Sequence, residues 1–364
     1  MREGAFIEDS ETGSMGPWSG FEAVFMVLGT VFCIFLALMG VQSHAASYQV
    51  PVTHFGQPDL QGVWTNATFT TLERPDEFEN LVLTKQETDA REAERRGFYE
   101  DYDDPDKVDG QLQAASDPGG YNTFWMDEGE ALAVVDSEVR SSIITHPEDG
   151  KVPYTWDGRW NMIKHGIQFT RFDGPETRPL GERCIVGFGS TGGPPMLPVL
   201  YNNNYQIVQN EDHVLIMVEM NHDVRTVRLN SEHPDKSVRK WLGDSIGWWE
   251  GDTLVVETTN FHPDQSFRAA IKHLLYASKD VTVTERFTRM ADDQIKYQFS
   301  MDDPDTFTEV WHGEMPLRKT DQAIYEYACH EGNYAMPGIL RGARLEESEG
   351  GGGGFMQTLA VWLR

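Results

Sequence analysis

Five ionisable residues fall on apolar faces of segments that are predicted to be β-strands. In the segment Val281–Arg289, side chains alternate in direction, so that Glu285 shares a face with Val283 and Phe287. The same spacing places Glu219 with Leu215 and Met217, Arg225 with Val227 and Leu229, and both Glu326 and His330 with Ile324 and Ala328. A lone buried carboxylate is costly unless it is paired or protonated. The pattern therefore predicts a polar cluster inside an apolar interior, where pKa values shift and proton transfer is feasible.

The residue types of this cluster suit acid–base chemistry. Glu285 or Glu219 would serve as the general base, His330 as the acid or proton shuttle, and Arg225 as the group that stabilises developing negative charge. Glu326 completes the predicted set of catalytic residues. The alternative is that the same charges form internal salt bridges that hold the strands together, and the sequence leaves both interpretations open.

These residues need a sheet to position them, and the segment Trp241–Phe261 gives its strongest signal. A tight turn at Glu250-Gly251-Asp252 separates two stretches rich in aromatic and β-branched residues, which is typical of a β-hairpin. Similar turn-forming residues between apolar segments predict further strands at Tyr205–Asn210, His213–Met220, Val224–Leu229, Val281–Arg289, Ile295–Met301, Phe307–Gly313 and Ala323–His330. About eight short strands with short connections favour an antiparallel meander closed into a barrel. The fold class is mainly β, with an N-terminal extension of helix and loops.

Four segments organise the chain. Residues 1–46 form a signal peptide or membrane anchor, and residues 47–200 an extension with the first strands and a helix. Residues 201–345 form the barrel core, and residues 346–364 a flexible glycine-rich tail. Within the extension, Thr84 and Glu87 form a capping box that predicts a helix over 84–96, which Gly97 would end.

The leader predicts export. Residues 23–41 form a run of 19 residues without charge, and small residues at Ser43, Ala45 and Ala46 suit signal-peptidase cleavage. The run is also near the length of a membrane span, so a retained single-span anchor in the inner membrane is the alternative. Either way, the sequence predicts a periplasmic or secreted body.

Two cysteines remain after the leader, Cys184 and Cys329. In an oxidising compartment they would form a disulfide, and two separate buried thiols are the alternative. The 11 histidines contain no HxH or HxxxH pair, so no metal site is predicted, and the sequence identifies no cofactor.

The net charge of the chain argues against one class of binding partner. The net charge of −28 repels the phosphate backbone, so nucleic acid is not an expected partner. The aromatic content, which includes Trp241, Trp248, Trp249 and Trp311, suits core packing and would also suit a small apolar or aromatic ligand. The sequence does not determine an oligomeric state.

Several blocks resemble a broad family of exported bacterial proteins for which we know of no established reaction. They are Arg140–Pro153, Arg183–Cys184, Tyr205–Gln209 with Glu219 and Arg225, Trp241–Phe261, Glu285–Arg289, Asp303-Pro304 and Glu326–Tyr334. The resemblance implies secretion and a shared β-rich fold, and it implies no reaction. The Gly62-Val63-Trp64 triplet carries a weaker similarity. It resembles the first strand of lipocalin-like (calycin) barrels, in which the Trp plugs one barrel end.

Together these observations predict an exported barrel that binds a small molecule. The leading hypothesis is a cofactor-independent acid–base enzyme, of lyase, hydratase or isomerase type, acting on an apolar or aromatic substrate. The alternatives are a non-catalytic carrier barrel and a structural protein of the cell envelope. A cavity surrounded by Glu, His and Arg would favour the enzyme, whereas an apolar cavity would favour the carrier.

Overall fold

The computed structural model describes residues 48–103, 127, 129–187, 191, 193–270 and 273–349. The chain divides into two compact units, residues 1–49 and 50–364, and only the second is described below. The predicted signal or anchor lies outside the described residues. Of the predicted tail, residues 346–348 belong to a helix, and residues from 350 onward lie outside the described part of the chain.

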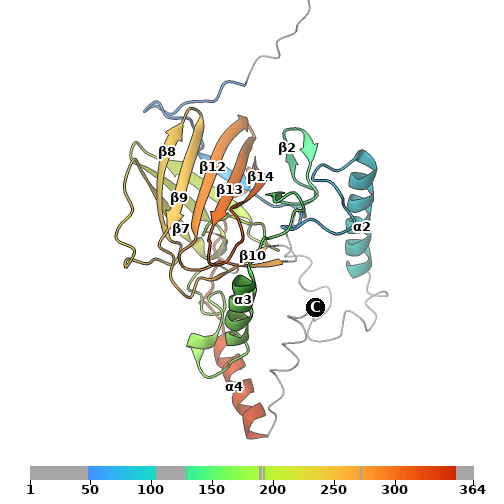
Figure 1. Ribbon diagram of the computed structural model, residues 1–364, viewed down its shortest axis with the longest axis vertical. Helices are drawn as coiled ribbons and strands as arrows, with labels where there is room; N and C mark the ends of the chain where they lie inside the picture. Colours follow the sequence, from blue (N-terminus) through green and yellow to red (C-terminus); the bar gives the residue numbers. More distant parts are fainter. Residues whose placement is uncertain are drawn as a thin grey trace, which may run out of the picture. The chain divides into compact units, whose positions relative to one another are not determined.

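Within the described residues, nine strands close into a barrel (Figure 1). They are β1 (Gly62–Thr65), β5 (Asn204–Gln209), β6 (His213–Val218), β7 (Val224–Leu229), β8 (Asp244–Glu250), β9 (Thr253–Thr259), β12 (Thr282–Ala291), β13 (Gln294–Asp302) and β14 (Trp311–Lys319). This confirms the predicted β-barrel. The predicted hairpin of Trp241–Phe261 is the pair β8–β9, with Glu250 opposite Thr253.

The barrel closes where β1 pairs with β14, placing Trp64 opposite Lys319 and Thr65 opposite Arg318. Neighbouring strands in the barrel are antiparallel except β7 and β8, which run parallel with Val227 opposite Ser245. The exception arises because residues 230–243 carry the chain back to the end of the sheet at which β7 began. The antiparallel arrangement of neighbouring strands is therefore broken once, between β7 and β8.

The predicted strand Ala323–His330 is absent, and this expectation was wrong. The physical reason is closure: β1 occupies the edge of β14 that a further strand would need. After Lys319 the chain leaves the sheet as an irregular segment. The predicted strand Phe307–Gly313 is also displaced, since β14 starts at Trp311 and continues through Pro316, a residue that disfavours strand prediction.

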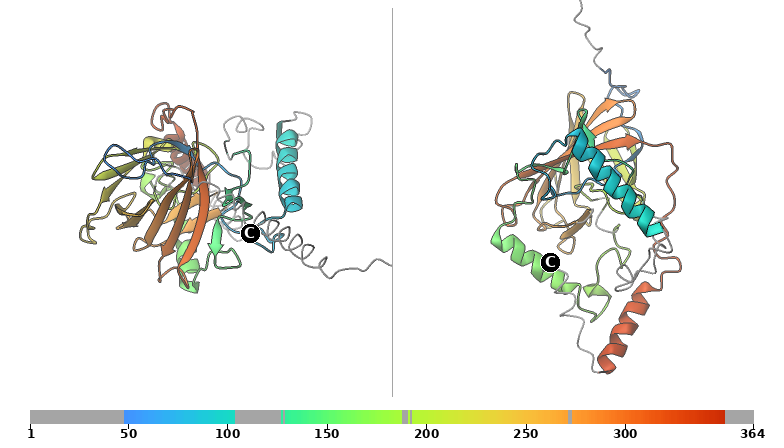
Figure 2. Two further views of the ribbon diagram at one scale, coloured as in Figure 1. Left: turned by 90° about the horizontal axis from the view of Figure 1, so that it is seen from above. Right: turned by 90° about the vertical axis from the view of Figure 1, so that its right-hand side faces the viewer.

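Shorter strands and helices surround the barrel. The strand β4 (Ile144–His146) pairs with β14, while β2 (Val134–Val135) pairs with β3 (Glu138–Val139), and β10 (Phe267–Ala270) pairs with β11 (His273–Tyr276). The helices are α2 (Lys85–Asp103), α3 (Trp156–Gln168) and α4 (Ala335–Ser348), with 3-10 turns at Pro175–Thr177 and Met220–His222. Figure 2 shows α2 outside the barrel strands.

Helix α2 starts as predicted and ends later. The Glu87 carboxylate accepts from the Thr84 backbone N–H at 2.7 Å, and the Thr84 hydroxyl accepts from the Glu87 N–H at 3.3 Å, which together form the capping box. Gly97 does not end the helix, which continues to Asp103. Glycine costs only about 1 kcal/mol in a helix interior, which neighbouring helix-favouring residues offset.

One end of the barrel is closed by Trp64, as its position after Gly62 predicts. The indole is fully buried and donates to the Leu60 carbonyl at 2.9 Å. The Arg289 guanidinium lies 5.6 Å from the Trp64 ring and donates to the Asp59 carbonyl at 2.7 Å. An aromatic ring held between a cation and the barrel interior seals this end.

The opposite end is covered by the hairpin β10–β11. Figure 1 shows β10 lying across this end of the barrel, next to α3. The Tyr276 backbone N–H donates to the Tyr154 hydroxyl at 2.9 Å, and the Tyr276 ring lies 5.2 Å from that of His165 on α3. Among the described residues, the strands of this hairpin pair only with each other.

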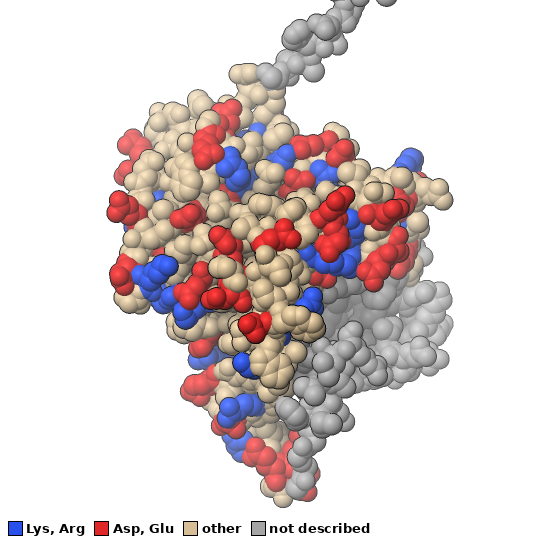
Figure 3. Space-filling view, in the orientation of Figure 1, with Lys and Arg blue, Asp and Glu red and all other residues tan. Residues whose placement is uncertain are grey.

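Acidic side chains are spread over the barrel face seen in Figure 3, with basic side chains interspersed among them. In the part of the chain that the structure describes, we find no helix with the length and apolar character needed to span a bilayer.

Candidate functional site

Among the residues that the structure describes, the interior of the barrel contains one fully buried ion pair. Arg225, on β7, and Glu285, on β12, have side chains that are 2% and 0% exposed, and their groups meet as a bidentate pair. Arg225 Nη1 donates to Glu285 Oε2, and Nη2 donates to Oε1 at 3.0 Å. Burial alone would lower the pKa of Arg225, but the Glu285 carboxylate raises it above its usual value. The pair therefore stays charged and mutually neutralised.

A tyrosine connects this pair to the backbone of a buried segment. Tyr297 Oη donates to Glu285 Oε1 at 2.8 Å and accepts from the Met196 backbone N–H at 2.9 Å. Burial and the adjacent Glu285 raise the pKa of Tyr297 well above its usual value, so the hydroxyl keeps its proton. Arg225 Nη2 also contacts Met196 Sδ at 3.4 Å. The network of Arg225, Glu285 and Tyr297 thus ends on Met196.

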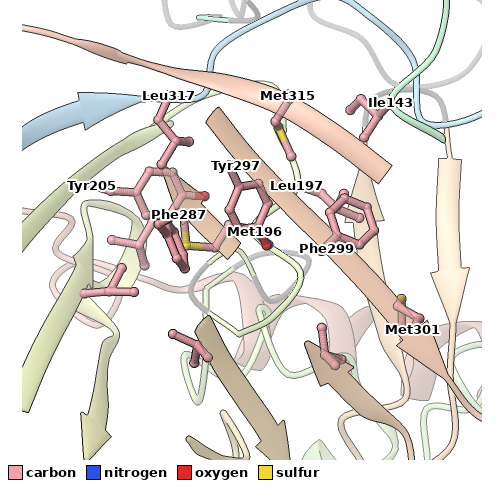
Figure 4. Close-up of a cluster of buried hydrophobic side chains, with 14 of the residues drawn as sticks. Ile143, Met196, Leu197, Tyr205, Phe287, Tyr297, Phe299, Met301, Met315 and Leu317 are labelled. Atoms are coloured by element: carbon pink, nitrogen blue, oxygen red, sulfur yellow. The ribbon is translucent and has the colours of Figure 1, made fainter. Parts of the chain in front are cut away.

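Met196 belongs to a segment that we call the plug, residues 193–199, each of which is buried. Figure 4 shows Met196 and Leu197 among the lumen side chains of Tyr205, Tyr297 and Phe299. Asn66 Nδ2 donates to the Met196 carbonyl at 3.0 Å, so both polar groups of this backbone unit are satisfied by side chains. The plug has no strand partner, which is why buried polar side chains must bind its backbone.

Glu219 lies outside this network, contrary to the prediction. The buried face of β6 carries Val214, Ile216 and Val218, one residue out of step with the predicted face. Glu219 follows the end of the strand and is buried by contacts with three nitrogen donors. They are Asn202 Nδ2 at 2.7 Å, Asn204 Nδ2 at 3.2 Å and the Tyr325 backbone N–H at 3.2 Å. A one-residue slip moves a side chain to the other face of a strand.

Glu326 and His330 are exposed, and their predicted place inside the barrel was wrong. Both lie in the irregular segment after β14, where no strand periodicity aligns their side chains. The structure therefore brings together two of the five predicted residues, Arg225 and Glu285. The catalytic roles assigned to the five remain predictions.

An apolar pocket of about 190 Å³ lies on the outer face of the hairpin β10–β11. Phe267, Ala269 and Leu274 form one wall, and the segment 179–187 with Phe169 forms the other. Asp264 supplies a charged group among the lining residues. The pocket is smaller than the sites of drug-sized ligands, at about 300–1,000 Å³. It exceeds the roughly 150 Å³ of an apolar cavity that holds benzene.

The predicted disulfide between Cys184 and Cys329 is confirmed, with a Cα–Cα distance of 5.8 Å. It fastens the 179–187 wall of the pocket to the irregular segment after β14. Asn333 Nδ2 adds a bond to the Cys329 carbonyl at 2.9 Å. The disulfide therefore limits the movement of this pocket wall.

Sequence reasoning missed Tyr297 and the plug. Tyr297 shares the buried face of β13 with Ile295 and Phe299, which lie two residues before and after it. The two-residue period that identified Glu285 therefore also places Tyr297 inside the barrel. Residues 193–199, GPPMLPV, carry no strand or helix period, and only their packing shows that they fill the lumen.

Metal ligands do not converge within the part of the chain that the structure describes, where no group of three or more His, Cys, Asp or Glu could hold an ion. Comparison of the chain with models of protein families, with curated proteins and with solved structures gave no match.

Proposed function

We propose that the protein is an exported, non-catalytic barrel that binds a small apolar or aromatic molecule in the pocket on the outer face of β10–β11. The observation that carries this proposal is the pocket itself, which has apolar walls and one charged residue, Asp264. A concave, mainly apolar site with few polar groups is typical of ligand binding.

The interior charges support binding over acid–base catalysis. A general base must reach its substrate and exchange protons with it. Glu285 is bonded to both Arg225 and Tyr297, and its side chain is shielded from solvent. The plug takes the place in the lumen that a substrate would need, so the polar groups there contact the chain itself: the Tyr297 hydroxyl accepts from the Met196 N–H, and Arg225 contacts Met196 Sδ.

Export is supported by the Cys184–Cys329 disulfide, because such bonds persist in oxidising compartments. The proposal keeps the predicted periplasmic or secreted location. A membrane anchor formed by residues 23–41 remains the alternative to cleavage.

The test is a fluorescence titration of the full chain with 1-aminonaphthalene, a two-ring probe whose emission depends on polarity. We expect saturable binding with one site. Ala269→Trp places an indole in the pocket and should abolish binding. Ala323→Trp is the matched control, because Ala323 is exposed in the irregular segment after β14 and should leave binding unchanged.

Two results would contradict the proposal: no saturable binding by the natural sequence, or equal binding by Ala269→Trp and Ala323→Trp. Circular dichroism of both variants establishes that the barrel is intact. Native mass spectrometry of protein purified from its own envelope would then identify the natural ligand and the mature N-terminus together.

A further inference from the structure

A second site is indicated by an arginine on the inner face of the hairpin. Arg268 lies on β10 between Phe267 and Ala269, whose side chains line the pocket, so its own side chain points the opposite way. It is 0% exposed. Its Nε donates to the Pro194 carbonyl at 2.7 Å, and its guanidinium lies 4.8 Å from the Phe261 ring.

The two terminal nitrogens of Arg268, Nη1 and Nη2, have no hydrogen-bond partner in the described part of the chain. Every other buried arginine there has at least one terminal nitrogen bonded. Arg225 shows the contrast, because both of its terminal nitrogens meet a carboxylate. An unpaired buried charge is strongly unfavourable, so this guanidinium lacks a partner that its environment requires.

Within the described residues, no acidic side chain pairs with the terminal nitrogens of Arg268. The Asp303 carboxylate interacts electrostatically with Arg268. Its two oxygens, however, accept hydrogen bonds from the Ser278 N–H at 2.7 Å and the Ser278 hydroxyl at 3.1 Å. Burial lowers the pKa of Arg268 to about 10, which still leaves the side chain cationic at neutral pH. The free edge of the guanidinium is thus a fixed positive charge in an apolar setting.

A second unpartnered group adjoins the same stretch of the plug. Gln265 is 1% exposed, and neither its Oε1 nor its Nε2 has a partner among the described residues. A Cβ on Gly193 would stand 2.7 Å from Gln265 Nε2, while Arg268 bonds to Pro194, the next residue. The amide and the guanidinium therefore both reach the two residues that begin the plug.

The hairpin offers a route to this buried position. Its strands pair with each other and with no barrel strand in the described residues, so displacing it breaks no barrel ladder. Its described polar attachments include the bonds of Tyr276 to Tyr154 and of Arg268 to Pro194. Displacing the hairpin would therefore uncover Arg268 without breaking the pairing of the barrel strands.

We propose that Arg268 and Gln265 form a binding site for a small monocarboxylate beneath the hairpin. The guanidinium edge matches the two oxygens of a carboxylate, and the Gln265 amide adds a donor. A single negative charge is favoured over a dianion because Asp303 already lies near. The Phe261 ring gives the ligand's hydrocarbon part an apolar neighbour. This site is separate from the pocket on the outer face of the hairpin and does not depend on it.

The test is thermal unfolding of the full chain in acetate or benzoate, each compared with its neutral amide, acetamide or benzamide. Binding to the folded state raises Tm with ligand concentration. We expect a carboxylate to raise Tm and its amide to have no effect. Arg268→Met should weaken carboxylate binding on the order of tenfold to a hundredfold, the range for a lost charged hydrogen bond.

Arg140→Met provides the matched control for stability, because Arg140 is buried and paired with Glu314 at 2.9 Å and Glu138 at 2.7 Å. Without ligand, Arg140→Met should lower Tm, whereas Arg268→Met should leave it unchanged or raise it, since an unpaired charge is removed. Arg268→Met should also still bind 1-aminonaphthalene if the outer pocket is a separate site.

Three results would overturn the proposal. The first is no response of the natural sequence to either carboxylate. The second is a carboxylate response that persists in Arg268→Met. The third is a loss of stability in Arg268→Met equal to that in Arg140→Met, including failure to fold, because it would show that the guanidinium already has its partner within the protein.

Discussion

Glu285 and Arg225 meet across the barrel from strands that are not neighbours, since β8 and β9 lie between β7 and β12 in the sheet. Their bidentate contact therefore connects opposite parts of the wall through the lumen. Tyr297 carries the contact on to the plug. The pair acts as a cross-link between the sheet and the segment that fills it.

Removing one partner of this pair should destabilise the fold strongly. Glu285→Gln leaves the Arg225 charge buried and uncompensated, and we expect a loss of about 3–5 kcal/mol in the free energy of unfolding. The double variant Arg225→Met/Glu285→Gln should lose far less than the sum of the losses in the two single variants, Arg225→Met and Glu285→Gln. Denaturant unfolding of all four proteins measures this coupling. Additive losses, or a Glu285→Gln variant with unchanged Tm, would contradict a structural role.

Glu219 should stabilise the segment that follows the barrel. Glu219→Ala removes the acceptor for Asn202, Asn204 and Tyr325, so we expect a loss of about 1–3 kcal/mol. Hydrogen exchange should also accelerate at the Tyr325 amide. Glu326→Ala, at an exposed position, is the control and should stay within roughly 0.5 kcal/mol of the natural sequence. Equal effects of the two substitutions would argue against this role.

Loss of the disulfide should affect both stability and the pocket. The bond joins residues separated by 145 positions. Cys329→Ser should lower the free energy of unfolding by about 2–5 kcal/mol. Because the 179–187 wall would lose its attachment, 1-aminonaphthalene should bind more weakly. The reduced natural sequence should behave like the variant, and unchanged probe binding in both would separate the pocket from the disulfide.

The ionisation of Asp244 should make the free energy of unfolding depend on pH under acidic conditions. Burial alone would raise the pKa of Asp244, but bonds from Lys240 at 2.5 Å, His233 at 2.9 Å and Arg228 at 2.6 Å lower it. A lowered pKa in the folded state means that the ionised form stabilises folding above the unfolded value of 3.8. This stabilisation is lost as pH falls through the folded pKa.

The measurement for Asp244 is the free energy of unfolding against pH, for the natural sequence and Asp244→Asn. The natural sequence should be the more stable above pH 3.8, and the difference should shrink below it. A difference that stays constant with pH would show that the ionisation of Asp244 does not contribute.

Local sequence patterns predicted much of the barrel because alternation and turn residues are properties of neighbouring positions. The hairpin β8–β9 follows from its Glu-Gly-Asp turn, and the inward direction of Arg225 and Glu285 follows from their apolar neighbours. The same reasoning failed for Glu219, where one residue of register decides the face. It failed for Glu326 and His330 because nothing local signals that β1 has already closed the sheet.

By itself, the sequence determined most strands of the barrel, the capped start of α2 and the presence of two cysteines suited to a disulfide. These follow from backbone preferences and side-chain period over a few residues. Only the tertiary structure decided that Arg225 faces Glu285, that residues 193–199 occupy the lumen, and that Arg268 is buried without an anion. Such contacts join positions far apart in the chain, and their energies depend on burial, which no local pattern specifies.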